Sequence, residues 1–275
     1  MDLDKLVDQM RVKPGKKIDL EKDFDPGWTG GYKKKSVDAD ELLEEGVAQL
    51  AKYQERLYAE NRQSLLVVIQ ALDAAGKDSA LAHVLTGLNP TGFQVFSFKA
   101  PNAEELDHDY LWRIVKALPE RGRIGIFNRS HYEDVLVVRV HNLVPPEVWE
   151  PRYEQINHFE RRLTDSGTTI LKFFLHISKD EQKDRLQERL DHPEKWWKFS
   201  KGDLKERERW DEYAEAYEAM LTRTSTDWAP WYVIPANRNW YRNLAVAQVV
   251  VDTLRGFDMA FPEPEEDLSD VTIPG

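Results

Sequence analysis

The feature of this 275-residue chain that most constrains its fold is a regular alternation of short apolar runs with longer helical patterns. Continuous apolar runs are typical of strands buried on both faces, as in a parallel sheet. Strand–helix alternation therefore predicts an α/β protein whose parallel sheet carries helices on both faces. The apolar runs lie at 64–72, 93–100, 123–128, 168–178 and 231–235, and helices are expected near 38–58, 77–87, 102–117, 146–165, 179–191, 203–223 and 238–257.

The two ends of the chain differ in composition from this central part. Residues 1–37 are dominated by Gly, Pro and charge, so we expect an irregular N-terminal arm. Residues 38–257 contain all the predicted strands and form the expected folded domain. Residues 258–275 are acidic and contain proline, which predicts a mobile tail.

Charge and composition exclude several function classes. The net charge of −11 argues against general binding of nucleic acid or of an anionic membrane. The absence of cysteine excludes disulfides and thiolate chemistry. The sequence shows neither a secretory apolar region nor a run of about 18 apolar residues, so a cytoplasmic protein is expected.

The segment ALDAAGKDS at 71–79 is similar to the phosphate-binding P-loop pattern GxxxxGK[S/T], but with two departures. Ala71 replaces the leading glycine, and Asp78 replaces the Ser or Thr that follows the lysine. The expected context is nevertheless present, because an apolar run precedes the loop and a helix start follows it. Backbone N–H groups at such a helix start favour an anion, and Lys77 adds a positive charge for terminal phosphates. The candidate phosphate-binding positions are Ala74, Ala75, Gly76, Lys77, Asp78 and Ser79.

Asp73 places a carboxylate inside a loop that is expected to bind a polyanion. Mg²⁺ is a hard cation that binds both carboxylate and phosphate oxygens. A metal ion held by Asp73 would therefore bridge to the phosphate that the carboxylate alone repels. The alternative interpretation is that Asp73 is a turn residue or a helix cap.

A second group of polar residues, FNRSHYEDV at 127–135, follows the third predicted strand. In P-loop proteins the end of the neighbouring strand delivers a second group to the metal. Asn128, Arg129, Glu133 and Asp134 are the candidates here, and the Arg129 guanidinium suits phosphate recognition. An ordinary helix start with charged capping residues is the alternative. His131 is interpreted as a packing residue, since an ionised phosphate acceptor needs no general base.

A basic segment containing a glycine precedes an amphipathic helix at about 192–223. Such a segment predicts a lid that closes over phosphates and excludes water. The alternative is a solvated charged surface. Its basic residues are Lys195, Lys198, Lys201, Lys205, Arg207 and Arg209, and Trp196 and Trp197 lie among them.

With these segments in place, the chain resembles the type-2 polyphosphate kinase family over residues 38–257. Several unusual motifs occur together in one order, which makes the resemblance specific. The motifs are LDAAGK at 72–77, FKAP at 98–101, LWR at 111–113, FNRSHYED at 127–134, KWWKFS at 195–200, WDEY at 210–213 and WYVIPANR at 231–238.

The resemblance implies a three-layer, thymidylate-kinase-like P-loop fold with five parallel strands and a helical lid. It implies reversible, Mg²⁺-dependent transfer of phosphate from inorganic polyphosphate to AMP or ADP, giving ADP or ATP, with Mn²⁺ as the alternative ion. It also favours a homo-oligomer, either a dimer or a tetramer.

The resemblance also implies roles for individual residues. Asp73, Lys77 and Arg129 would be catalytic, with Asp73 on the metal, Lys77 on the phosphates and Arg129 on the transferred or acceptor phosphate. Lys198, Lys201 and Arg207 of the lid would clamp the phosphate chain. Lys33, Lys34 and Lys35 of the arm are expected to extend this basic groove, and the alternative is a plain solvated loop. By analogy with related kinases, Lys99 and Arg113 are placed near the acceptor nucleotide.

One motif departs from the family pattern. Many members have Asp-Arg-Ser-Trp-Tyr-Asn where this chain has NRSHYE at 128–133. Asn128 is a weaker metal ligand than Asp, so Glu133 is the expected second carboxylate. Glu133 also resembles the class of the family that accepts both AMP and ADP, and we therefore expect dual acceptor use.

Two other functions are compatible with the motifs. An ATP-dependent kinase acting on a nucleotide or small metabolite is allowed by the P-loop, but the missing glycine and Ser/Thr argue against ATP bound in the usual way. A non-catalytic module that binds polyphosphate or nucleotide is the second alternative. Asp73 beside Lys77 argues against it, since a passive anion site has little use for a carboxylate.

Overall fold

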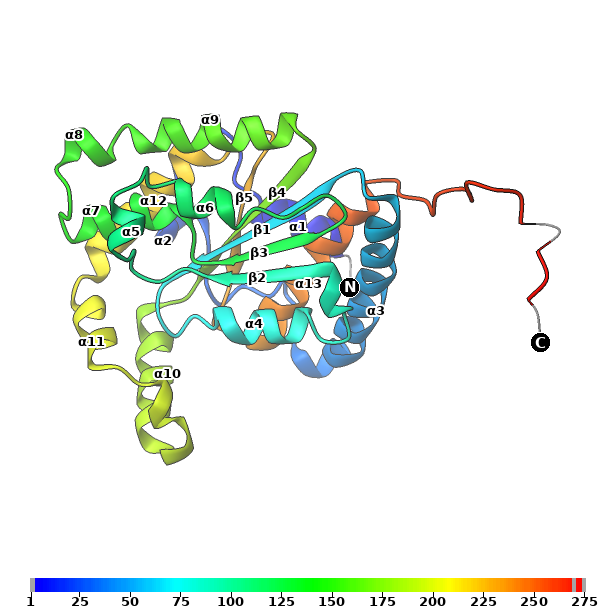
Figure 1. The fold of residues 1–275 in the computed structure, drawn as a ribbon. Helices are drawn as coiled ribbons and strands as arrows, with labels where there is room; N and C mark the ends of the chain where they lie inside the picture. Colours follow the sequence, from blue (N-terminus) through cyan, green and yellow to red (C-terminus); the bar gives the residue numbers. More distant parts are fainter. Residues whose placement is uncertain (1–2, 269–270, 274–275) are drawn as a thin grey trace.

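The computed structural model describes residues 3–268 and 271–273, and its centre is a five-stranded sheet (Figure 1). All neighbouring strands pair in parallel, in the order β2-β3-β1-β4-β5. This confirms the predicted sheet and all five predicted strands. The strands are β1 Ser64–Ala71, β2 Phe93–Ser97, β3 Ile124–Asn128, β4 Thr168–His176 and β5 Trp231–Pro235.

The central strand β1 explains why its sequence shows no polar alternation. Leu65, Val67 and Ile69 point into one hydrophobic core, whereas Leu66 and Val68 point into the other. Because successive side chains leave a strand on opposite faces, both sets must be apolar. All eight residues of β1 are buried.

Helices cover each face of the sheet, as Figure 1 shows. The first core lies between the sheet and α1 Leu3–Met10, α3 Ala39–Glu60, α4 Lys77–Val84 and α13 Asn239–Arg255. The second core lies between the sheet and α6 Trp112–Lys116, α7 Val137–Val140, α9 Arg152–Asp165 and α12 Trp210–Thr224.

The structure differs from the sequence expectation in the N-terminal arm. Instead of being irregular throughout, the arm forms α1, which packs on α13, and the short helix α2 Leu20–Asp23. Met10 and Val12 are buried, and the Val12 N–H donates to the carbonyl of Trp231 on β5 at 2.8 Å. The arm therefore closes one edge of the sheet.

Three of the predicted helices are interrupted. The 102–117 segment forms α5 Ala103–Leu106 and α6, and the 146–165 segment forms α8 Pro146–Trp149 and α9. Pro151 lies at the junction of α8 and α9, where its ring removes a helix donor. The lid segment forms α11 Lys201–Glu208 and α12, which meet at Arg209. Helix α10 Lys179–Asp191 and the 3₁₀ turns η1 Lys34–Ser36, η2 Pro90–Gly92, η3 His131–Asp134 and η4 Pro193–Lys198 complete the fold.

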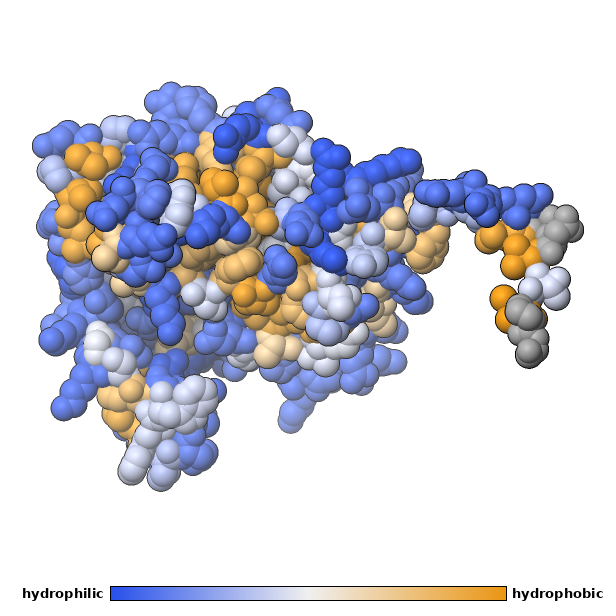
Figure 2. Space-filling model, viewed as in Figure 1, coloured by the Kyte–Doolittle hydropathy of each residue, from blue (hydrophilic) through white to orange (hydrophobic). Residues whose placement is uncertain are grey.

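Several features lie at the periphery of the fold. Figure 1 shows α10 and α11 projecting from the body and the C-terminal segment running away from it. The tail residues at 258–268 and 271–273 form no helix or strand, and the rest of the expected mobile tail lies outside the described residues. Figure 2 shows an apolar area over β2 and α6, where Val95 and Val115 are exposed. Within the described ranges, no helix is long and apolar enough to cross a membrane.

Candidate active site

The loops that follow β1, β2 and β3 meet at one edge of the sheet. Asn128, the last residue of β3, is in register with Ser97 at the end of β2 and with Ile69 near the end of β1. Because the carboxyl ends of parallel strands lie together, the polar residues that follow them are brought into one region. The P-loop-like segment and the NRSHYE segment are therefore neighbours, as the sequence predicts.

The P-loop-like segment adopts backbone conformations that explain its small residues. Gly76 precedes the first turn of α4 with φ of +94°, and Ala74 has φ of +61°. A Cβ atom at position 76 would overlap the Arg242 guanidinium, so any other residue would require Arg242 to move. The Lys77 amino group donates to the carbonyl of Ala71 at 2.8 Å, which folds the side chain back along the loop. Burial lowers the pKa of Lys77, while the Asp73 carboxylate opposes that shift.

Side chains of α10 and α13, which were not predicted as site residues, donate hydrogen bonds to backbone carbonyls of this loop. Arg185 of α10 donates to the carbonyl of Ala74 at 3.0 Å, and Gln182 donates to the carbonyl of Asp73 at 3.0 Å. Arg242 of α13 donates to the carbonyl of Ala75 at 3.1 Å and to Ser79 Oγ at 3.2 Å. Arg242 is fully buried, and burial lowers its pKa to about 10. The available signal was an arginine that stands shortly before the apolar segment LAVA at 244–247 of a predicted helix, since arginine is rarely buried without partners.

Arg129 connects the two loops. Its backbone has φ of +62°, and its N–H donates to the carbonyl of Ile69 at 3.1 Å. This turns the side chain toward the P-loop, where the guanidinium lies 3.5 Å from the Asp73 carboxylate. A left-handed backbone at a non-glycine residue is often associated with functional sites. Both side chains stay accessible to a ligand, with Arg129 44% and Asp73 28% exposed.

Three adjoining cavities share Arg129 in their walls. The first, of about 300 Å³, lies between Asp73, Glu133 and the lid. The second, of about 430 Å³, lies between Arg113, Asp134 and the FKAP loop at 98–101. The third, of about 460 Å³, lies between the P-loop and the lid residue Lys198. Arg129 is thus placed to contact ligands that enter from different sides.

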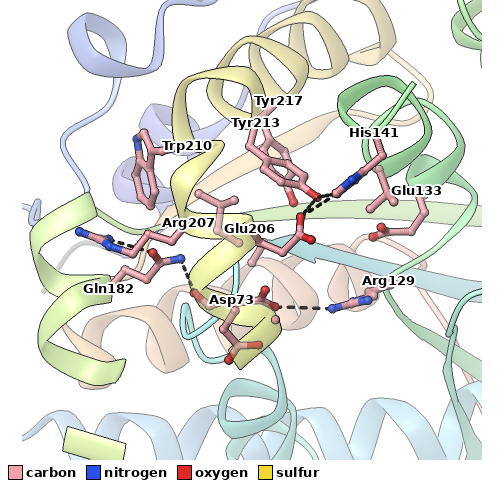
Figure 3. A pocket seen from close by; sticks show the side chains of 15 residues that line it. Asp73, Arg129, Glu133, His141, Gln182, Glu206, Arg207, Trp210, Tyr213 and Tyr217 are labelled. Carbon is pink, nitrogen blue, oxygen red and sulfur yellow. Dashed lines mark hydrogen bonds and ion pairs between the residues drawn. The ribbon is translucent and has the colours of Figure 1, made fainter. Parts of the chain in front are cut away.

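The first cavity is shown in Figure 3, where Glu206, His141 and Tyr213 converge near Asp73 and Arg129. Burial raises the pKa of Glu133, and Arg129 opposes that shift. The Gln70 amide, oriented with its nitrogen toward Glu133, donates to that carboxylate at 2.9 Å.

Contacts with neighbouring elements hold the lid over the first cavity. Tyr213 donates to Glu206 at 2.6 Å, and His141 bonds the same carboxylate oxygen at 2.9 Å. Arg207, expected to clamp phosphate, lines the cavity but donates to the Lys179 carbonyl at 2.6 Å and to Gln182 at 2.9 Å. These bonds fix α11 against α10 and the end of α7.

The second cavity contains the residues expected near the acceptor. Arg113 donates to the carbonyl of Lys99 at 2.8 Å and lies over the Phe98 ring. Asp134 pairs with Arg152 at 3.1 Å, and burial raises the pKa of Asp134 to about 6. An aromatic face beside cationic groups suits a nucleotide, which has an apolar base and anionic phosphates.

The third cavity contains the cations and acids of the P-loop. Lys77, Asp78 and Ser79 line it together with Asn128, whose amide donates to Asp78 at 2.7 Å. Trp197, Lys198 and Asp203 of the lid segment and Arg189 of α10 complete the wall. Burial, reinforced by Asp73, raises the pKa of Asp203.

Four of the residues expected to contact polyphosphate line none of these three cavities. Lys34 and Lys35 line a separate concavity at the start of α3, and Lys34 pairs with Asp40 at 3.4 Å. Lys33 precedes η1, and Lys201 is exposed at the start of α11. Their contact with polyphosphate stays a prediction. His131 is fully buried against Glu160, as expected of a packing residue.

The donor set at the P-loop fits a hard divalent cation. Within the described ranges, no three acidic or histidine side chains converge as a complete metal cage. Mg²⁺ does not require one, because it is usually held by one or two carboxylates together with phosphates and water. Asp73, accessible and beside Lys77 and Arg129, supplies such a carboxylate where phosphate would bind.

Comparisons with known proteins agree with this geometry. The family model described as Polyphosphate kinase 2 (PPK2) matches residues 32–262. The AMP/ADP-polyphosphate phosphotransferase of Meiothermus ruber is 56% identical over 255 residues, which is 93% of this chain and 95% of that protein. The ADP-polyphosphate phosphotransferase of Rhodopseudomonas palustris is 48% identical over 267 residues, covering 93% of this chain and 92% of that protein.

A solved structure shows the same fold. Polyphosphate kinase 2 from Arthrobacter aurescens TC1 superposes with a TM-score of 0.90 at 47% identity, covering 94% of this chain and 92% of that one. Both sequence and structure thus match over nearly the whole length of these relatives. The chain has a P-loop kinase fold and belongs to the polyphosphate kinase 2 family.

Proposed function

We propose that this protein is a phosphotransferase that moves phosphoryl groups from inorganic polyphosphate to AMP and to ADP. The observation that carries the proposal is the position of Arg129. Its side chain lines the first, second and third cavities and lies 3.5 Å from the Asp73 carboxylate. A cation shared by these cavities can neutralise charge on a group that is transferred between a polyanionic donor and a nucleotide. The names of the Meiothermus ruber and Rhodopseudomonas palustris relatives support the same donor and acceptors.

In this mechanism the polyphosphate occupies the first and third cavities, between the P-loop and the lid. The nucleotide occupies the second cavity, beside the FKAP loop. An ionised oxygen of the nucleotide's terminal phosphate attacks the end phosphorus of the chain. The new P–O bond forms as the bond to the next phosphate breaks, and the shortened polyphosphate leaves with that electron pair. No proton transfer is required.

The residues of this chain act by positioning and by charge. Lys77 and the N–H groups at the start of α4 bind the donor phosphates, and Arg129 neutralises charge on the phosphoryl group in transit. The lid excludes water, which prevents hydrolysis of the polyphosphate. Arg185 and Arg242 keep the loop in the required conformation from behind.

A divalent cation is part of this proposal, and Mg²⁺ is the ion that oxygen donors favour, with Mn²⁺ as a substitute. Asp73 is the first candidate to hold it. The ion would neutralise donor and acceptor charge and thereby lower the repulsion between two polyanions.

The proposed acceptor range rests on Glu133, which resembles the residue of the class that accepts both AMP and ADP. Glu133 lines both the second cavity and the first one, next to Arg129. We propose that the chain accepts AMP as well as ADP, so that both phosphorylation steps occur at one site. Self-association into a dimer or tetramer is also proposed, and sedimentation velocity would test it.

The test of acceptor use is an assay with purified protein, Mg²⁺ and long-chain polyphosphate, given either AMP or ADP and sampled over time by chromatography. Dual use predicts ATP from ADP, and from AMP first ADP and then ATP. Product from ADP alone would exclude the AMP step. No product from either nucleotide would contradict the proposal.

A further inference from the structure

Asp78 and Asn128 form a hydrogen bond between the P-loop helix and the neighbouring strand. Asp78 lies in the first turn of α4, directly after Lys77, and Asn128 is the last residue of β3. Asn128 Nδ2 donates to Asp78 Oδ1 at 2.7 Å. Since a carboxylate only accepts, the bond fixes which end of the Asn128 amide faces it. Both side chains line the third cavity together with Asp73 and Lys77.

These two positions are the ones that hold Mg²⁺ in ordinary P-loop enzymes. There the Ser or Thr after the P-loop lysine and an acidic residue at the end of a neighbouring strand both bind the ion. This chain has the carboxylate at the first position and an uncharged amide at the second. The carboxylate thus stands at the start of the helix instead of at the end of the strand, and the pair still carries the charge of one carboxylate.

We infer that Asp78 is a ligand for the divalent cation and that Asn128 orients its carboxylate, an inference that rests on the proposed function. Asn128 occupies Oδ1, and within the described ranges no hydrogen bond or ion pair engages Oδ2. Asp78 is exposed to the cavity, so this oxygen is available to an ion. Asp73 lines the same cavity and supplies the other carboxylate.

The alternative carboxylate, Glu133, fits this position less well. It lines the first and second cavities but not the third, which holds Lys77 and the start of α4. It also accepts from Gln70 at 2.9 Å, and burial disfavours its charged form. Asp78 therefore shares its cavity with Lys77 and the start of α4, whereas Glu133 lines only the two neighbouring cavities.

The test measures binding of Mn²⁺ alone by the decrease of the free Mn²⁺ signal in electron paramagnetic resonance. It compares the intact protein with Asp78→Asn, with the exchanged pair Asp78→Asn/Asn128→Asp, and with Glu154→Gln. The last variant removes an exposed first-turn carboxylate from α9 and so controls for the loss of a favourable helix-end charge. Thermal unfolding of each variant verifies the fold.

We expect Asp78→Asn to weaken Mn²⁺ binding on the order of ten-fold or more. The exchanged pair should restore affinity to within about three-fold of the intact protein, because the carboxylate then returns to the end of the neighbouring strand. Glu154→Gln should bind as the intact protein does. Unchanged affinity in Asp78→Asn would overturn the inference, as would a loss that the exchanged pair does not restore or an intact protein with no saturable Mn²⁺ binding.

The same preparations separate this inference from the proposed function. Polyphosphate-driven ATP formation by the intact protein, with Mn²⁺ affinity unaffected by Asp78→Asn, refutes the inference and leaves the function standing. The opposite result is that Asp78→Asn loses Mn²⁺ binding and the exchanged pair restores it, but the intact protein does not use polyphosphate. This result refutes the proposed function and supports Asp78 as a metal ligand.

Discussion

The Arg129 guanidinium lies 3.5 Å from the Asp73 carboxylate and joins the loop after β3 to the loop after β1. The pair is partly exposed, so it contributes little to folding stability. It does place a cation and a candidate metal ligand side by side where the three cavities adjoin. Changes to either residue should therefore affect catalysis far more than the fold.

Replacing either member of this pair should abolish most of the activity. We expect Asp73→Asn and Arg129→Lys each to reduce kcat/KM on the order of 10²–10³-fold, since a positioned charge is lost or loses its bidentate geometry. Steady-state kinetics with polyphosphate and ADP measures the loss. Asp165→Asn, which breaks a similarly exposed ion pair with Arg161, is the matched control and should leave turnover unchanged. Near-normal turnover in Asp73→Asn would remove Asp73 from the site.

Gly76 should be far less tolerant of alanine than another glycine with the same backbone. Gly76 has φ of +94° and Gly167 has φ of +93°, but a Cβ atom at 76 would meet Arg242, whereas one at 167 has its nearest neighbour at 3.8 Å. Gly167→Ala should cost about 1–2 kcal/mol of unfolding free energy from backbone strain alone. Gly76→Ala should cost about 1–3 kcal/mol more because Arg242 must move. Urea denaturation measures both, and equal costs would contradict the packing described here.

A fully buried ion pair supports η3, the turn that carries Glu133. Lys172 donates to Glu160 at 2.6 Å, to Tyr132 at 2.9 Å and to the Thr224 carbonyl at 2.7 Å. Despite burial, Lys172 and His131 hold the pKa of Glu160 below its usual value. Lys172→Met would leave this carboxylate buried without its cation.

We expect Lys172→Met to lower the unfolding free energy by about 3–5 kcal/mol. The double variant Lys172→Met/Glu160→Gln removes the uncompensated charge and keeps an acceptor for Tyr132, so it should recover at least part of the loss. Chemical denaturation of the two variants measures this coupling. A double variant no more stable than Lys172→Met would show that the buried charge is not the cause.

Asp134 should make stability depend on pH in a predictable direction. Burial raises its pKa from 3.8 to about 6, so the folded state favours the protonated form. The stability that this group contributes is fully present below the unfolded pKa and is lost as the pH rises through about 6. Asp134→Asn, which cannot ionise, should therefore gain stability relative to the intact protein between about pH 4 and about pH 7.5, by up to about 3 kcal/mol. Urea denaturation across this range measures the difference, and a difference independent of pH would contradict the shifted pKa.

The strands and the P-loop were predictable because their signals are local. A run such as LLVVI at 65–69 has no polar alternation, and this fixes a strand covered on both faces. The LDAAGK segment lies between such a strand and a helix, which identifies a phosphate-binding turn in spite of its missing residues. The family resemblance rests on these same segments, and the comparisons confirm it.

Other parts depend on contacts between distant residues and have little local signal. Arg242 reaches the carbonyl of Ala75 across 167 positions, and Arg185 reaches Ala74 across 111. The arm does place apolar residues at helical spacing, at Leu6, Val7 and Met10, but a helix of eight residues is marginal alone, and α1 is stabilised by its packing on α13. The pairing of Asn128 with Asp78 likewise follows from strand register, which places two loops 50 residues apart in contact.

The central claim is that inorganic polyphosphate is the phosphoryl donor. The most direct test is ³¹P NMR of the purified protein with Mg²⁺ and AMP. One sample contains long-chain polyphosphate as the sole donor, and the other contains ATP as the sole donor. The account predicts that in the first sample the mid-chain polyphosphate signal falls relative to the end-group signal as the chains shorten, and that ADP and then ATP appear. ADP formation in the ATP sample, with polyphosphate left intact in the first, would contradict the account and indicate an ordinary ATP-dependent kinase.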